Sequence, residues 1–241
     1  MKAIIIKEIK AFFNNNIGLI ISAIFLLIFG TIQWTTIFQL SIVESGYSNM
    51  YTFFIISPPM FILYISSISM KSLSEEYKSG TIELLLTKPL KPFEIVLSKF
   101  LALFIIVLVT IISTLIYPLS LYFLGETVGN IDVGEVLGSY IGLIFTCSTF
   151  ISISLFCSST TSNQVNALLL SIILNFLIFY GFTTLANYID YSNINILLNK
   201  IGAQYHYDLI SKGVIVFSDI IYFISITILF LLFTEKNILK R

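Results

Sequence analysis

Six apolar segments, each close to the length of a membrane crossing, constrain this chain more than any other feature. A helix needs about 20 apolar residues to span the hydrocarbon core of a bilayer. The predicted spans are roughly 17–37, 51–70, 97–124, 139–157, 165–185 and 214–234. Only 11% of the 241 residues are charged, whereas about a quarter are charged in a soluble domain. The sequence therefore predicts an all-α integral membrane protein in which residues 1–241 form one membrane domain.

The basic residues predict how these spans are oriented. Inner loops of membrane proteins carry an excess of Lys and Arg. If the N-terminus is inside, only Lys200 and Lys212 of the 13 basic residues fall on the outer side. The remaining eleven on the inner side are Lys2, Lys7, Lys10, Lys71, Lys78, Lys88, Lys91, Lys99, Lys236, Lys240 and Arg241. We therefore expect a multi-pass protein with both termini in the cytoplasm.

The first residues of the chain have the pattern of an amphipathic helix. Ile5, Ile9, Phe12 and Phe13 fall on one helical face, while the nearby lysines lie elsewhere on the wheel. Residues 1–13 are therefore expected to form an elbow helix on the inner leaflet, followed by a turn at residues 14–16. A cytoplasmic extension of the first span is the alternative.

Residues 71–91 form a charged island between two apolar spans. Seven of its residues are charged: Lys71, Glu75, Glu76, Lys78, Glu83, Lys88 and Lys91. Gly80 suits the left-handed residue that ends a helix, and Ser79 or Thr81 suits a cap for the next helix. Pro92 suits the first turn of the following span. The pattern predicts a helix end, a tight turn, a short amphipathic helix and a proline turn.

This short helix is predicted to be a docking element rather than an ordinary solvated loop. Its sequence, residues 81–87, combines four large apolar residues with a single acid, Glu83. An exposed apolar patch of this kind usually marks a contact with a partner.

The island also carries a family resemblance. The string Glu76-x-x-x-Gly80-Thr81-x-Glu83-x-Leu85-x-Thr87-x-Pro89 resembles the cytoplasmic loop of ABC-2 type transporter permeases. The elbow helix, the six spans and a folded outer segment at 186–213 resemble the same family. A closer similarity, to gliding-motility-associated permeases, rests on residues 1–13, 75–90, 128–140 and 205–215. The chain departs from that pattern at Val216 and Ser218, where an acid and a basic residue are expected.

The resemblance implies a transporter subunit without enzymatic activity of its own. The loop would be the coupling helix that inserts into a separate ATP-binding subunit, which would hold the ATP. A second permease chain, identical or related, would complete an exporter in the bacterial inner membrane. The residues expected to couple the two subunits are Glu75, Glu76, Gly80, Thr81, Glu83, Leu84, Leu85 and Leu86. The leucines would supply a buried grip, and the acids would pair with basic residues of the partner or of the elbow helix.

Other motifs in the chain speak against enzymatic and ion-coupled functions. The nearest approach to a phosphate-binding loop, Gly129 to Gly134, is followed by Glu135-Val136 where Lys and Ser or Thr are required. The lone His206 is interpreted as a packing residue. No Lys, Arg, Asp or Glu lies deep in a predicted span, which argues against an ion-coupled carrier. No cofactor, metal or nucleic-acid partner is expected.

Several positions within the spans have more than one interpretation. Gly134, Gly138 and Gly142 recur every four residues and favour close helix packing, either within the chain or across a dimer. Asn175 would hydrogen-bond between helices or line a substrate path. Prolines at 58, 59 and 118 are expected to kink their spans. For the whole chain, a membrane anchor for a cytoplasmic partner and an ion-coupled carrier or channel remain alternatives.

Overall fold

The computed structural model describes residues 1–35, 50–87, 90–124, 129, 131–189, 192–213 and 216–240, and this part of the chain contains helices and no strand. Six helical segments are long and apolar enough to cross a membrane: Asn16–Trp34, Tyr51–Ser79, Pro92–Leu124, Val133–Thr160, Gln164–Asn187 and Phe217–Lys240. The prediction of an all-α protein with six spans is confirmed. The predicted span ends at 36–37 and 214–215 lie outside the described residues.

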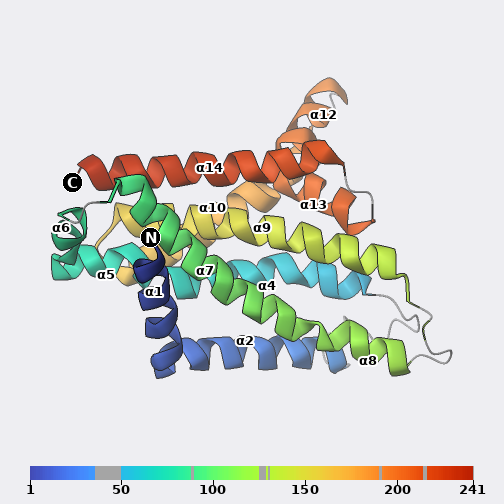
Figure 1. Cartoon of the computed structure of the whole chain (residues 1–241). Helices are drawn as coiled ribbons and strands as arrows, with labels where there is room; N and C mark the ends of the chain where they lie inside the picture. The colour runs from blue at the N-terminus through green and yellow to red at the C-terminus, as the bar shows by residue number, and fades with distance from the viewer. Residues whose placement is uncertain are drawn as a thin grey trace.

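The helices form a bundle of roughly aligned spans (Figure 1). In chain order they are α1 Lys2–Asn14, α2 Asn16–Trp34, α4 Tyr51–Ser69, α5 Lys71–Ser79, α6 Thr81–Leu86, α7 Pro92–Thr114, α8 Ile116–Leu124, α9 Val133–Thr160, α10 Gln164–Phe176, the π-helical turn η2 Leu177–Gly181, α11 Phe182–Asn187, α12 Ser192–Ile201, α13 Ala203–Ser211 and α14 Phe217–Lys240.

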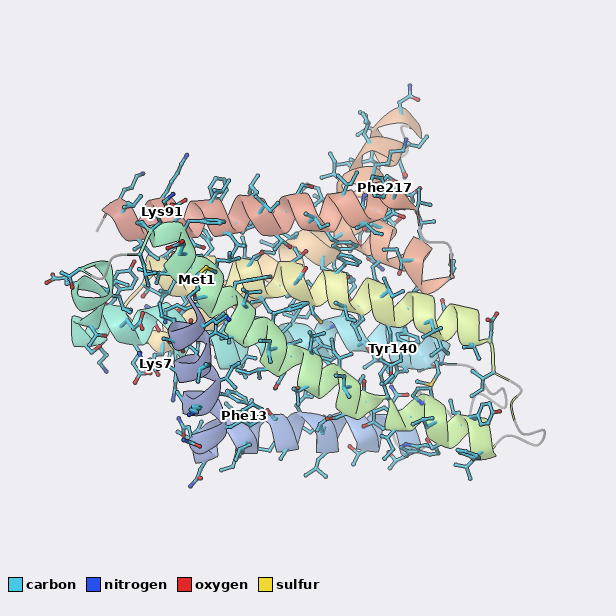
Figure 2. All side chains as sticks on the ribbon, viewed as in Figure 1. Met1, Lys7, Phe13, Lys91, Tyr140 and Phe217 are labelled. Atoms are coloured by element: carbon cyan, nitrogen blue, oxygen red, sulfur yellow. The ribbon has the colours of Figure 1, made fainter. Side chains whose placement is uncertain are left out.

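One end of the bundle gathers both termini together with α5 and α6, and we call it the terminal end (Figure 1). Figure 2 labels Met1, Lys7 and Lys91 toward this end, and Phe217, where α14 begins, toward the other. The opposite end carries α8, α12 and α13. The outer segment predicted at 186–213 is thus built mainly from two short helices, α12 and α13.

Helix α1 lies across the terminal end instead of extending α2 (Figure 1). The two helices are separated at Asn15, whose backbone is extended, with φ −93° and ψ 118°. The Asn15 side chain accepts a hydrogen bond of 3.0 Å from the backbone N–H of Ile17 and so caps α2. The predicted elbow helix and its asparagine turn are therefore confirmed.

Helix α9 is the central helix of the bundle. It packs against α4, α5, α7, α10, α13 and α14. The share of buried residues in its span is 72%, compared with 22–28% in the spans that begin at α2, α10 and α14. Many of its buried residues are small, including Gly142, Ser154 and the free thiols Cys147 and Cys157. Small side chains allow neighbouring helices to approach closely.

Pro58 and Pro118 each release a backbone carbonyl group, and a tyrosine from another helix satisfies each of these two carbonyls. A proline lacks the N–H that would bond the carbonyl four residues earlier. Pro58 therefore frees the carbonyl of Phe54, which accepts a 2.8 Å bond from the Tyr207 hydroxyl on α13. Pro118 frees the carbonyl of Thr114, which accepts a 3.2 Å bond from the Tyr140 hydroxyl on α9.

The two proline sites differ in how much they disturb the helix. Near Pro118 the helix breaks at Leu115 into α7 and α8, as expected for a kink. Helix α4 instead continues through Pro58 and Pro59 without a break in its assigned range. In a membrane every freed backbone group needs a partner within the protein, because the hydrocarbon supplies none. The tyrosine bonds therefore fix α13 against α4, and α9 against α7.

Replacing Tyr207 with Phe should lower the free energy of unfolding by about 1–3 kcal/mol, because it leaves the buried carbonyl of Phe54 without a partner. In the Pro58→Ala background the helix can supply its own N–H, and the cost should shrink. Thermal unfolding in detergent of the two single variants and the double variant measures this coupling. Tyr188→Phe, at a side chain that is 88% exposed, is the control. If the losses of unfolding free energy in the two single variants simply add up in the double variant, Tyr207 does not cap the Phe54 carbonyl.

Candidate functional site

The charged island folds as two short helices that meet at a glycine. Helix α5 ends at Ser79, and Gly80 adopts a left-handed backbone with φ 70° and ψ 4°. Helix α6 begins directly afterwards at Thr81. The hydroxyls of Ser79 and Thr81 lie 2.9 Å apart across the turn. The predicted order of helix end, glycine turn and short helix is confirmed, and Pro92 opens α7 as expected.

The two helices have one exposed side and one buried side. Among the predicted coupling residues, Glu75, Gly80, Thr81 and Glu83 are exposed. Leu85 is only 7% exposed and packs within the core of this same chain. The Leu85 side chain is therefore covered by its own chain in this structure, and its contact with a partner stays a prediction. The side chains of Leu84 and Leu86 lie outside the described residues.

Glu76 is also committed to this chain, through an ion cluster around Lys99. The Lys99 ammonium lies 3.0 Å from Oε1 of Glu8 and 2.9 Å from Oε1 of Glu76. It also donates a 2.7 Å hydrogen bond to the backbone carbonyl of Ser72. Glu8 belongs to α1, Glu76 and Ser72 belong to α5, and Lys99 belongs to α7. One buried ammonium thus joins the elbow helix α1, helix α5 and the third span, α7.

Lys99 is the functional residue that the sequence did not reveal. In the sequence, Lys99 is only one of eleven basic residues on the predicted inner side. In the structure, its side chain is 1% exposed. A buried lysine is costly unless it is paired and hydrogen-bonded, and here three acceptors surround it. The available signal was its position, well inside the apolar run that follows Pro92. The sequence contained nothing that identified its partners.

A serine from the central helix holds the other end of α5. The hydroxyl of Ser158 on α9 donates to the carbonyl of Met70 at 3.1 Å. It accepts hydrogen bonds from the backbone N–H groups of Leu73 and Ser74 at 3.0 and 3.1 Å. These three backbone groups lie at the junction of α4 and α5. Helix α5 is therefore fixed to the bundle both by its backbone and by Glu76.

The outward surface of α5 and α6 is polar, and the inward side of α5 is bonded to the bundle. Figure 1 shows both helices at the terminal end of the bundle, with α6 as its outermost element. Such an arrangement suits contact with another macromolecule. Within the described residues, no group of three or more His, Cys, Asp or Glu side chains could hold a metal ion.

The glycines at 138 and 142 are used for packing inside this chain. A Cβ atom at Gly138 would approach the carbonyl oxygen of Ile210 to 3.0 Å and Cα of Gly213 to 3.1 Å. A Cβ atom at Gly142 would lie 3.0 Å from Cγ2 of Ile210. Gly134 meets only the side chain of Asp132. Of the two interpretations, the structure gives intramolecular packing of α13 against α9 for Gly138 and Gly142.

Asn175 joins helices in a buried polar network. Its Nδ2 donates to the hydroxyls of Ser154 and Ser171 at 3.1 and 3.3 Å. Ser171 also donates to Ser66 at 2.7 Å, so the network connects α4, α9 and α10. Of the two interpretations for this amide, the structure supports the interhelical hydrogen bond.

A second buried contact between ionisable side chains lies at the opposite end of the bundle. Nδ1 of His206 on α13 lies 2.7 Å from Oδ1 of Asp219 on α14, and Nε2 lies 2.8 Å from the carbonyl of Lys200. His206 thus has a structural role, tethering the outer helices to the last span, and its ring stacks on Tyr222.

We expect Gly80→Ala to destabilise the turn by about 1–2 kcal/mol, because φ of 70° is unfavourable for a residue with a Cβ atom. The site has open space around it, so no steric clash contributes. Gly181→Ala is the matched control: Gly181 has helical angles, and alanine there should stabilise by about 0.5–1 kcal/mol. Hydrogen exchange of the amides of residues 79–87 and 178–184 measures both. Similar protection of α6 in Gly80→Ala and in the wild type would contradict the expectation.

Lys99→Met should cost about 3–5 kcal/mol of unfolding free energy, because it leaves two carboxylates without their counter-charge. Adding Glu76→Gln should recover part of this loss. Lys91→Met, at an exposed lysine at the start of the same helix, should change stability by no more than about 0.5 kcal/mol. Unfolding in detergent compares the variants. Equal effects of the two lysine substitutions would exclude the anchoring role of Lys99.

Comparison with known proteins places this arrangement in a family. A model of the ABC-2 family transporter protein matches residues 2–233, which run from α1 into the C-terminal part of α14. No curated protein sequence matches the chain. The family match includes the elbow helix, the spans and the α5–α6 element, and it covers nearly the whole length of the sequence. The chain is a member of the ABC-2 family of transporter proteins.

Proposed function

We propose that this chain is the membrane-spanning permease subunit of an ABC exporter, coupled to a separate ATP-binding subunit through α5 and α6. The proposal rests on the exposed polar surface of these two helices. Their inward side is bonded to α7 and α9 directly, and to α1 through Lys99. A partner that moves this surface would move a rigid element, because Glu76, Ser72 and the α4–α5 junction are all bonded to the bundle. Rigid elements transmit such motions well.

The proposed contact differs from the one that the leucine run alone suggests. With Leu85 and Glu76 directed into this chain, the ATP-binding subunit would meet Glu75, Thr81 and Glu83. Charged groups at the edge of an interface mainly set orientation and association rate. The partner surface would therefore carry basic side chains opposite Glu75 and Glu83.

The excess of Lys and Arg at the terminal end supports a cytoplasmic location for α5, α6 and both termini, in a bacterial inner membrane. A second permease chain would complete the translocation path, and the lipid-facing surfaces of α2 and α10 are available for it, with 28% and 22% of their spans buried. The similarity to gliding-motility-associated permeases supports export of envelope or motility-related material.

The test is co-purification from native membranes with a readout of ATPase activity. Glu83→Lys should weaken capture of a Walker-motif ATPase about tenfold, because it replaces an attractive charge with a repulsive one. Asp208→Lys, the same change at an exposed acid of the opposite end, should leave capture unchanged. Both variants must give the wild-type unfolding temperature, which shows that the permease itself is intact.

Three outcomes separate the proposed function from its alternatives. Loss of ATPase capture and stimulation in Glu83→Lys alone supports a coupled permease. Capture of a partner without any change in ATP hydrolysis indicates a membrane anchor. Equal capture by the two variants, or no ATPase at all, refutes docking at α5 and α6, and transport that follows an ion gradient would then identify a carrier.

A further inference from the structure

A cavity of about 510 Å³ lies at the terminal end, beneath the elbow helix. Its walls come from α1, from the adjacent ends of α2, α4 and α7, and from α5 and α6. Its volume is within the range of small-molecule sites, roughly 300–1,000 Å³. The same residues that anchor the docking element, Lys99 and Glu76, form part of the wall. An occupant would therefore touch the elbow, three spans and the docking element together.

The lining changes from polar to apolar along the spans. Lys71 and Glu75 lie on α5, at the terminal end of the cavity. Leu103 and Ile106 on α7 and Ile21 on α2 lie further into the bundle. Ile106 is seven residues beyond Lys99, which is about 10 Å along a helix. A ligand matched to this gradient has a charged head and an apolar tail.

The charges of the lining are balanced but not fully paired. Three basic residues, Lys7, Lys71 and Lys99, face three acids, Glu8, Glu75 and Glu76. Lys99 is used by Glu8 and Glu76. Oε2 of Glu76 is buried and has no hydrogen-bond partner within the described residues. Among the described residues, the lining groups that make no ion pair are the ammonium groups of Lys7 and Lys71 and the exposed carboxylate of Glu75.

We propose that this cavity binds one zwitterionic aminophospholipid from the leaflet around the terminal end. Its primary ammonium would face the exposed carboxylate of Glu75, while its phosphate would lie near Lys7 and Lys71. An acyl chain would fill the apolar part between α2, α4 and α7.

The proposal does not depend on the exporter function, since it concerns a bound lipid and not a cargo. The lipid would brace α5 and α6 from the cavity. Glu75 and Thr81 are exposed and also line the cavity, so they would lie at the border between the lipid and the surface offered to a partner. It would act beside the Lys99 cluster, linking the elbow to the docking element through its headgroup.

The experiment is native mass spectrometry of the full chain, released from nanodiscs that contain phosphatidylethanolamine, phosphatidylcholine and phosphatidylglycerol in equal amounts. One phosphatidylethanolamine per chain should be retained, about tenfold more than phosphatidylcholine, whose quaternary ammonium cannot donate a hydrogen bond. Ser67→Phe, which places a ring into the cavity from α4, should abolish this retention. Ser113→Phe is the matched control, because Ser113 also bonds the carbonyl four residues earlier but lies outside the cavity.

A second pair of variants tests the headgroup and protects the test against misfolding of Ser67→Phe. Lys71→Glu should reduce retention of phosphatidylethanolamine about tenfold, whereas Lys78→Glu, on the same helix but outside the lining, should not. Equal retention in Ser67→Phe and Ser113→Phe, or equal retention of phosphatidylcholine and phosphatidylethanolamine, would overturn the proposal. Preference for phosphatidylglycerol would also overturn it and would indicate a simple anion site. A change in ATPase capture has no bearing on any of these outcomes.

Discussion

The ammonium group of Lys99 is the interaction on which the terminal end of this protein depends. Helix α5 has only nine residues, and helices of this length are not stable alone in water. Its position must therefore come from contacts with the bundle, which include the bonds from Lys99 to Glu76 and to the carbonyl of Ser72 and the bonds from Ser158 on α9. Because Glu8 shares the same ammonium, the elbow helix is fixed by the same group. The cavity beneath the elbow exists because these three segments are held at this distance from one another.

Several polar groups elsewhere in the bundle are also satisfied by partners within the protein. The carbonyls freed by Pro58 and Pro118 receive tyrosine hydroxyls, and Asn175 bonds to serines on neighbouring helices. In hydrocarbon, apolar contacts give little preference for one helix pair over another, because lipid tails are equally apolar. The hydrogen bonds therefore specify which helices meet. The apolar residues of the spans favour insertion into the membrane, and the polar residues within the spans determine which helices pack together.

The sequence predicted those features that depend on neighbours along the chain. Span length and the glycine turn at Gly80 follow from local composition and backbone preference, and so does the elbow break at Asn15. It did not predict features that depend on which helices lie together. Leu85 was predicted to contact a partner because helical periodicity identifies the apolar face of α6 but not the residues that pack against that face. The pairing of Lys99 with Glu8 joins residues 91 positions apart, and no local pattern encodes such a contact.

The division between the two sides of α5 and α6 has a consequence for how the element works. Its inward side, with Glu76 and Leu85, is bonded or packed and determines where the element sits. Its outward side, with Glu75 and Glu83, makes no ion pair within the described residues and is free to meet a partner. Under the proposed function, recognition and anchoring would thus be carried by different residues of one short segment. A force applied at Glu83 would pass through Glu76 to Lys99, and from there into both α7 and the elbow helix. The partner's movement would then reach the elbow helix and the third span together, through the Lys99 ammonium.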